Sequence, residues 1–583
     1  MRSFFKIFFA SLLSLVVFFL LVFFILASIA GSLASRKAEP VAAKSILVLD
    51  LDQQFKEQAQ ENAIDAVLNR NESTTPGLYD AIRLIRHAET DNNIAGIYIV
   101  ANGNANGFAS SDELRNALQH FKTSRKFIIA HGDGMTQKAY FIASVADRVY
   151  VNPVGALEWT GFSSELFFIK GMLDKLGIQP QIFYAGKFKS ATEPLRVDKM
   201  TPENKLQTSE WLGDLYNYFL ERCGEARNLD TATLHNLANT AAIQTTQDAV
   251  ANKLIDAAKY DDEVKDEFKK RLGLGKYDKL NFVTINAYDD AVDYTMSGTD
   301  RIAVIYAEGD IVDGQGTQEN IGGDTYRKLI RKIRLDKSIK AVVLRINSGG
   351  GSALASENMW RELELAKRDK PVVVSFGDVA ASGGYYMACG GDSIFASRNT
   401  ITGSIGVFGV LPNMQTFFNN KLGVTFDGVK TAPYADVGAI YRPATEPEKT
   451  FIQAGVNRVY AQFLQRVAQG RKRDTAYINS IAQGRVWSGE DAVRNGLVDK
   501  IGGLPDAIAC AARMAKTKSY RLREYPQRES WIDRFLNKAT PSPQAAIKEK
   551  IGAENFAIYQ QLLKVNELCS GVQARLPFGF IMH

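Results

Sequence analysis

Ser382 is the residue of this sequence best suited to act as a nucleophile. It lies in the small-residue run AASGGYY, where a helix is expected to begin. Small neighbours let a substrate carbonyl approach, and the N–H of Gly383 is placed to stabilise an oxyanion on the attacked carbon. An ordinary N-cap serine would also suit this position. Ser404 in TGSIG is a second candidate, although its run is more typical of a close-packed turn.

Lys189, in the run YAGKFKSA, is the candidate base. A lysine base must be neutral, so its pKa must fall by about 3 units from its ordinary value, which costs roughly 4 kcal/mol. Most lysines are solvated surface residues, but Phe183 and Phe188 favour burial here. No histidine is well placed, so a Ser–Lys pair is the arrangement left for activating a serine. His131 is the alternative base.

A glycine-rich turn, Asn347–Ser352 (NSGGGS), follows the apolar run AVVLRI and precedes an expected helix. Glycines there allow a tight turn with outward N–H groups, which is typical of an anion or oxyanion site. A phosphate-binding loop is the alternative, but the sequence has neither GxxxxGK[ST] nor GxGxxG.

The chain contains two copies of one unit, with Lys126–Asp147 matching Pro371–Asp392. In this alignment Ser382 faces Gln137, and Lys189 faces Ala435. The nucleophile is therefore present only in the second copy and the base only in the first. We expect the pair to form across the junction between the copies, either within one chain or between subunits.

Short apolar runs alternate with helical patterns in both copies. This alternation predicts an α/β fold, a tandem duplication with mainly parallel sheets and crossover helices. Expected strands are Ser45–Leu51, Ile302–Ala307, Ala341–Ile346 and Val372–Ser375; expected helices are Tyr326–Leu335, Leu354–Lys367 and Glu448–Gln469. Expected domains are an anchor and linker (1–40), a first repeat (41–295), a second repeat (296–525) and a helical tail (526–583).

Residues 7–30 contain no charge and predict one membrane-spanning helix. A helix of that length reaches roughly 36 Å, more than the ~30 Å hydrocarbon core. A signal peptide is the alternative because Ala27–Ala30 ends in small residues, but the apolar core of a signal peptide is shorter. We therefore expect an uncleaved anchor in the lipid bilayer.

The remaining composition excludes several function classes. The net charge is only +6, and no basic stripe with interleaved aromatics indicates nucleic-acid binding. The 4 cysteines form no CxxC pair, and the 5 histidines have no metal-ligand spacing. We expect neither a metal site nor another cofactor.

Four motifs together resemble the signal peptide peptidase A family, in its long duplicated form called protease IV: NSGGGSALASE, FGDVAASGGYYMA, TGSIGVFGV and GKFKSATEP. That family belongs to the crotonase and caseinolytic-protease-like superfamily. The resemblance implies a bacterial inner-membrane serine endopeptidase and a bowl-shaped homotetramer. It also implies a Ser/Lys dyad that degrades cleaved signal peptides on the extracytoplasmic side.

Carried over by motif, the resemblance implies that Ser382 is the nucleophile and Lys189 the general base. It also implies that Gly350 and Gly383 supply the oxyanion N–H groups. Gly349 stands where the family usually has proline, so this loop is expected to be more flexible.

The expected function is therefore a membrane-anchored serine endopeptidase acting on hydrophobic peptides. Two alternatives remain open. One is a crotonase-type acyl-CoA enzyme, which would also use an N–H oxyanion site. The other is a non-catalytic membrane scaffold.

Overall fold

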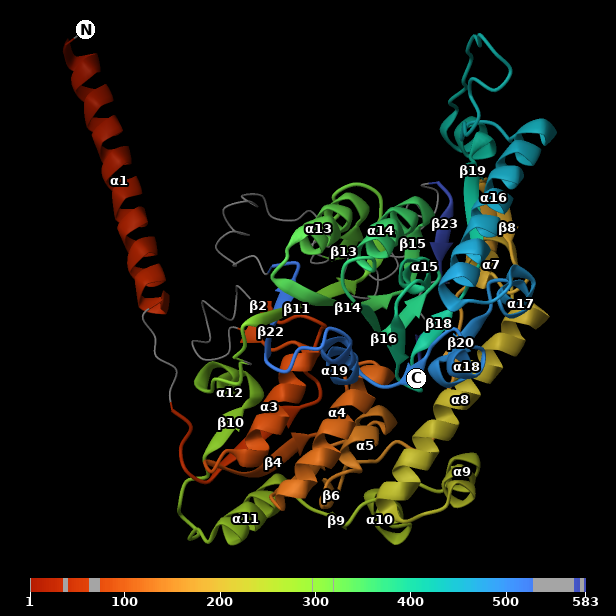
Figure 1. Cartoon of the computed structure of the whole chain (residues 1–583). Coiled ribbons are helices and arrows are strands. Elements are labelled where there is room, and N and C mark those ends of the chain that lie inside the picture. Colours follow the sequence, from red (N-terminus) through yellow and green to blue (C-terminus); the bar gives the residue numbers. More distant parts are fainter. Residues whose placement is uncertain are drawn as a thin grey trace.

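Two α/β units follow one another along the chain in the computed structural model of Figure 1. The structure describes residues 2–34, 40–61, 74–295, 297–317, 319–527, 571–576 and 581–582. Each unit has its own mainly parallel sheet and its own buried apolar core.

The first unit contains a 6-stranded sheet in the order β10-β1-β4-β5-β6-β9. Every pairing in it is parallel. Its strands are β1 (Ser45–Asp50), β4 (Ile94–Val100), β5 (Phe127–Gly132), β6 (Arg148–Val151), β9 (Ala257–Ala258) and β10 (Phe282–Thr284). Apolar runs such as Leu47 and Leu49 in β1 are fully buried, as expected for a parallel sheet covered by helices.

The second unit contains an 8-stranded sheet, with a main path in the order β20-β18-β16-β14-β11-β22. Its pairings are parallel except for the antiparallel pair β18–β20. The strands are β11 (Asp300–Glu308), β14 (Ile339–Ser348), β16 (Val372–Ala381), β17 (Ser393–Ala396), β18 (Ile401–Gly403), β20 (Val486–Ser488), β21 (Lys500–Ile501) and β22 (Tyr520–Tyr525).

Helices of the two units correspond in order. In the first unit they are α3 (Leu78–Thr90), α4 (Phe108–Phe121), α5 (Gln137–Ala143) and α8 (Pro202–Arg227); in the second, α13 (Gly323–Leu335), α14 (Ala353–Ala366), α15 (Gly383–Ala388) and α16 (Glu446–Arg471). Even single contacts recur. The hydroxyl of Tyr140 donates to the carbonyl of Leu254 at 2.5 Å, and that of Tyr385 donates to Leu497 at 2.8 Å. The predicted duplication is therefore present in the fold.

Shorter elements complete the two units. The helices are α6 (Lys170–Leu176), α7 (Glu193–Arg196), α9 (Thr231–Asn239), α10 (Thr246–Ala251), α11 (Asp261–Leu272), α12 (Ile285–Ala291), α17 (Thr475–Ile481), α18 (Gly489–Arg494) and α19 (Leu504–Met514). Single turns are η1 (Lys122–Ser124), η2 (Ser190–Thr192) and η3 (Phe417–Leu422), and strands β2 (Gln60–Glu61) and β3 (Thr74–Thr75) form a small pair.

A third sheet joins segments that are far apart in sequence. Its order is β13-β12-β15-β23-β19-β8. The strands are β8 (Gln179–Ala185) of the first unit, β12 (Asp310–Val312), β13 (Asn320–Gly322), β15 (Gly350–Ser352) and β19 (Val407–Asn413) of the second, and β23 (Gln573–Arg575) near the C-terminus. Figure 1 shows β23 and β8 beside the second unit's helices.

Charged side chains hold the two units together. Asp378 of the second unit accepts hydrogen bonds from the N–H groups of Ala109 and Ser110 at the start of α4, at 2.8 and 3.0 Å. Arg345 on β14 is fully buried and pairs with Glu57 at 2.8 Å and Glu113 at 2.6 Å, both from the first unit. The relative placement of the units is thus fixed next to the glycine-rich turn.

Both ends of the chain were predicted to be helical. Residues 7–30 belong to α1 (Arg2–Ala34), but the side chains of 22–23 and 25–34 lie outside the described residues. In the described part, no helix has the length and hydropathy that crossing a membrane requires. Most of the tail, 526–583, lies outside the described residues; its described segments include β23 and β24 (Ile581–Met582), which pairs with β7 (Ser164–Glu165).

Candidate active site

Lys189 of the first unit and Ser382 of the second are in direct contact within one chain. The Nζ of Lys189 donates a hydrogen bond to the Oγ of Ser382 at 2.8 Å. Both side chains are buried. The structure thus brings together the two residues that the duplication separates, and it does so without a second subunit.

The backbone around Lys189 is held by a loop of the second unit. Gly186, just after β8, has φ +109°, which turns the chain towards that loop. The N–H of Phe188 donates to the carbonyl of Gln483 at 2.8 Å. Gly484 lies so close that a Cβ there would come within 2.6 Å of the backbone nitrogen of Lys189. The lysine loop therefore belongs structurally to both units.

Gln207 on α8 fixes the same junction from the other side. Its Nε2 donates to the carbonyl of Phe188 at 3.1 Å, and its Oε1 accepts from the N–H of Val486 at 3.1 Å. The sequence analysis did not select Gln207, because a glutamine in a polar helix carries no local sign of such a role.

Burial prepares Lys189 to act as a base. Desolvation lowers the pKa of its amine well below the ordinary value, and no neighbouring carboxylate among the described residues opposes that shift. The amine also donates to the carbonyl and the Oγ of Ser404, at 3.1 and 3.0 Å. Ser404 is thus a neighbour of the candidate base, whereas the sequence around it was more typical of a turn.

Ser382 has a strained backbone, with φ 54° and ψ −114°. Such a conformation in a non-glycine residue costs about 1–3 kcal/mol and is concentrated at functional sites. The Ser382 N–H donates to the carbonyl of Gly403 at 2.8 Å. Its side chain makes no capping hydrogen bond to α15. The N-cap interpretation therefore does not explain this serine.

Gly350 and Gly383, the predicted oxyanion glycines, lie next to one another. A Cβ on Gly350 would come within 2.7 Å of the Gly383 nitrogen. Gly383 is the first residue of α15, so its N–H has no acceptor within the helix. The N–H of Gly350 donates to the Oγ of Ser348 at 3.1 Å. One donor is thus available, and the other is held by a serine that the sequence analysis did not select.

An extended segment of the chain itself lies beside these glycines. Strand β23 pairs antiparallel with β15 on one side and with β19 on the other. The N–H of Leu576, just beyond β23, donates to the carbonyl of Gly349 at 2.9 Å. The Leu576 side chain is buried in an apolar cluster with Ala381 and Trp211. The strands next to Ser382 therefore pair with an extended segment of the chain.

The equivalent place in the first unit is filled by structural hydrogen bonds. Gln137 stands where the second unit has Ser382. Its Oε1 accepts from the N–H groups of Thr160 and Gly161 at 3.0 and 2.9 Å. Ala435, the counterpart of Lys189, is exposed. Each unit lacks the residue that the other supplies.

The alternative base, His131, is used elsewhere. Its Nε2 lies 3.2 Å from the carbonyl of Lys259, and its Nδ1 lies 3.5 Å from the hydroxyl of Tyr98. Across the described ranges, no group of at least 3 metal-ligating side chains gathers.

Comparison with known proteins decides the family. The sequence profile described as Peptidase family S49 matches residues 120–275 and 364–518, once in each unit. The chain belongs to peptidase family S49. It is a serine peptidase of that family with a duplicated α/β fold and mainly parallel sheets.

Relatives within the family cover most of the chain. It is 37% identical to Protease 4 of Salmonella typhi over 82% of this chain and 78% of that protein. It is 34% identical to Protease 4 of Haemophilus influenzae over 86% and 84%. It is also 34% identical to the chloroplastic serine protease SPPA of Arabidopsis thaliana over 73% and 64%. The resemblance to protease IV is thus confirmed.

Proposed function

We propose that this S49 peptidase is a Ser/Lys endopeptidase. The observation that carries the proposal is the 2.8 Å contact between the buried amine of Lys189 and the Oγ of Ser382. A neutral amine has only two N–H groups, which donate to Ser404, so the Ser382 hydroxyl must donate to the lone pair of Lys189 Nζ. The desolvated, neutral lysine then accepts the serine proton while Oγ attacks a peptide carbonyl. The protonated lysine then gives that proton to the leaving amine, and water hydrolyses the acyl-enzyme in the reverse sequence.

The oxyanion of the tetrahedral intermediate is held in this proposal by Gly383 and Gly350. The Gly383 N–H lies at the helix start, where it is free to donate. The Gly350 N–H must leave Ser348 Oγ to donate as well. Ser404 is a positioning residue, since its two oxygen acceptors orient the Lys189 amine towards Ser382.

The proposed substrates are extended hydrophobic peptides, including cleaved signal peptides. Strand β23 supports an extended binding mode, because it pairs through its backbone with the strand that carries Gly350. The buried cluster around Leu576, with Phe108 and Trp211, supports an apolar substrate side chain at the position of Leu576. A peptide bound there would take the place of β23.

The proposed setting is the bacterial inner membrane. Residues 7–30 would anchor the chain in the lipid bilayer, with the catalytic body on the extracytoplasmic side. We also propose that each unit is a crotonase or caseinolytic-protease-like unit and that the chain forms a homotetramer. These proposals rest on the sequence motifs and on the uncharged apolar run in α1.

Cleavage of an internally quenched hydrophobic peptide by the full chain in detergent tests this function. Wild type should cleave it, whereas Ser382→Ala and Lys189→Met should each lose at least 100-fold in kcat/KM. A chain that binds the peptide without cleaving it would instead support the membrane scaffold. Cleavage that persists in both variants would reject the dyad.

A further inference from the structure

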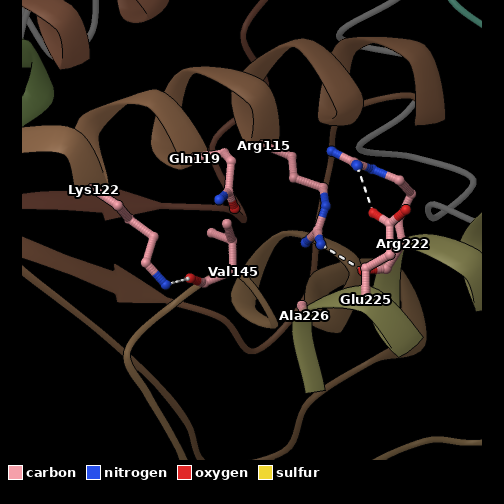
Figure 2. Close-up of a pocket in the computed structure, with 7 residues that line it drawn as sticks. All are labelled: Arg115, Gln119, Lys122, Val145, Arg222, Glu225 and Ala226. Carbon is pink, nitrogen blue, oxygen red and sulfur yellow. Dashed lines mark hydrogen bonds and ion pairs between the residues drawn. The ribbon is translucent and has the colours of Figure 1, made fainter. Parts of the chain in front are cut away.

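A cavity of about 300 Å³ lies in the first unit, away from the residues assigned to catalysis. It is lined by Arg115, Gln119, Lys122, Val145, Arg222, Glu225 and Ala226. Figure 2 shows the guanidinium of Arg115 reaching from α4 into the space between Val145 and Glu225. Three cationic side chains therefore meet at one cavity.

Arg115 is a buried cation that no carboxylate neutralises directly. Its guanidinium donates to the carbonyls of Phe141 and Arg222 and to the Oγ of Ser144. No ion pair is formed by Arg115 within the described ranges, and burial lowers its pKa. A buried charge without a partner is costly. An anion in the cavity would offset that cost.

Hydrogen-bond donors remain available at the cavity. The Nε atoms of Arg115 and Arg222 are both buried, and among the described residues neither has an acceptor. Lys122 donates to the carbonyl of Val145 at 3.0 Å and pairs with Asp147 at 3.2 Å, at the more exposed side. Such a set of cationic donors suits the oxygens of a phosphate group.

The negative groups nearby are already engaged. Glu225 pairs with Arg222 at 2.8 Å. Asp112, on the same helix as Arg115, accepts hydrogen bonds from Tyr218 and Asn116. Among the described residues that line this cavity, Arg115 is thus the cation without an ion-pair partner.

The second unit provides an internal comparison, because Lys367 there makes the same two contacts as Lys122. Lys367 corresponds to Lys122; it donates to the carbonyl of Gly390 at 2.6 Å and lies 3.6 Å from Asp392. In this unit Trp360 stands in place of Arg115 and Glu364 in place of Gln119.

These two replacements fill and acidify the second unit's version of the cavity. Trp360 is buried, and the guanidinium of Arg466 lies over its ring at 4.1 Å. A Cβ on Gly390 would come within 2.1 Å of the Glu364 carboxylate, so that space is taken. The corresponding place is therefore filled by Trp360 in the second unit and is a cationic cavity in the first.

We propose that the cavity beside Arg115 binds a phosphate group. The contacts would come from the Nε of Arg115, from the amine of Lys122 and from the side-chain amide of Gln119. A free phosphate ester and a phospholipid headgroup share this chemistry, so the experiment must separate them.

The test measures acetylation of lysines in the full chain by an amine-reactive reagent, read by mass spectrometry. Inorganic phosphate is added at constant ionic strength, with chloride as the reference anion. Phosphate should slow the labelling of Lys122 at least 3-fold and leave Lys367 unchanged. Equal labelling in phosphate and chloride, or equal protection of both lysines, would overturn the proposal.

Two matched variants exchange the distinguishing residue. Gln119→Glu installs the carboxylate of the second unit and should raise the half-protecting phosphate concentration at least 10-fold. Glu364→Gln removes the corresponding carboxylate from the second unit. It should leave the half-protecting phosphate concentration unchanged and should not create protection of Lys367, because Trp360 still fills the second unit's cavity. Protection that is as strong in Gln119→Glu as in wild type would contradict the proposal.

Two further arms identify the source of the phosphate. They use sn-glycerol 3-phosphate in solution and phosphatidic acid in neutral detergent micelles. Stronger protection by the soluble ester indicates a small metabolite, and stronger protection by the micelles indicates a lipid headgroup. If neither compound protects Lys122 from labelling, the proposed phosphate site is rejected.

Discussion

The amine of Lys189 and the hydroxyl of Ser382 lie 2.8 Å apart although 193 positions separate them in the sequence. One residue comes from each unit, and the corresponding positions hold Ala435 and Gln137. Neither unit contains a complete Ser/Lys pair. The Ser/Lys pair therefore requires one residue from each of the two units.

Lys189→Met should stabilise the protein near neutral pH. Burial lowers the pKa of Lys189 in the folded state, while the unfolded chain keeps the ordinary value of 10.5. Between these values the unfolded state binds more protons, so wild-type stability rises with pH and levels off above the ordinary value.

Thermal unfolding from pH 6 to 10 checks this prediction. The Lys189→Met variant should melt a few degrees higher at pH 7, and the difference from wild type should shrink as the pH rises. Lys187→Met, two residues away, is the control and should follow wild type. An unchanged difference across the range would show that Lys189 is charged in the folded state.

Removal of the Ser404 hydroxyl should make Lys189 a less effective base while leaving its amine in place. Ser404→Ala deletes an oxygen that accepts a hydrogen bond from the Lys189 amine at 3.0 Å. Loss of an acceptor destabilises the protonated amine, so the lysine pKa should fall further. We expect kcat to drop about 10-fold.

The pH profile of kcat separates this positioning role from a structural one. Its acidic limb should move to lower pH in Ser404→Ala, while KM stays close to wild type. A change in KM alone, with an unmoved pH profile, would contradict the role of Ser404.

Gly350→Ala should strongly lower kcat while the chain still folds. Gly350 has φ +99°, and a Cβ there would lie 2.7 Å from the Gly383 nitrogen and 2.1 Å from the carbonyl oxygen of Ala574. Loss of oxyanion donors typically costs 100- to 1,000-fold in kcat, about 2.7–4 kcal/mol.

Gly349→Ala is the matched control, because its Cβ would only touch Leu576 at 3.6 Å. It should retain near wild-type activity. Both variants should also be measured in a chain that ends before Gly571, which removes the contact with Ala574. Recovery of Gly350→Ala in that background would show that the clash with β23, and not the oxyanion, explains the loss.

Deletion of residues 571–583 should lower KM for extended peptides and leave kcat unchanged. Strand β23 pairs with β15, so a peptide that uses the same backbone groups must displace it. Initial rates with peptides of four and eight residues measure the effect, and the longer peptide should gain more. An unchanged KM for both lengths would mean that substrates bind elsewhere.

Arg345→Met should weaken the junction between the units. The variant leaves Glu57 and Glu113 buried without their cation, which typically costs 3–5 kcal/mol. The melting temperature should fall, and the triple variant Arg345→Met/Glu57→Gln/Glu113→Gln should recover part of it. A triple variant less stable than the single one would contradict this account.

The alternation of apolar runs and helices was sufficient to predict the α/β class and most elements of the second unit. Predicted strand Val372–Ser375 is longer in the structure, where β16 continues to Ala381. Its second half, FGDVAA, is not apolar enough to indicate a strand. It forms one because Ala380 pairs with Ser348 and Thr402 in neighbouring strands.

The third sheet and the environment of Lys189 could not be predicted from the sequence. Strands β8, β19 and β23 pair across long separations, and no local pattern encodes such partners. Ser404 lies between β18 and β19 with a φ of +50°, and its hydroxyl accepts a hydrogen bond from Lys189. The residue types of the dyad were predictable from the duplication, whereas its supporting contacts required the fold.

Labelling of the full chain by a fluorophosphonate, with the modified residue mapped by mass spectrometry, tests the Ser/Lys pair most directly. Ser382 should be the modified serine in wild type, and its labelling rate should rise with pH as Lys189 loses its proton. In Lys189→Met the rate should fall at least 100-fold and lose that pH dependence. Labelling of Ser382 at the wild-type rate in Lys189→Met would contradict the pair.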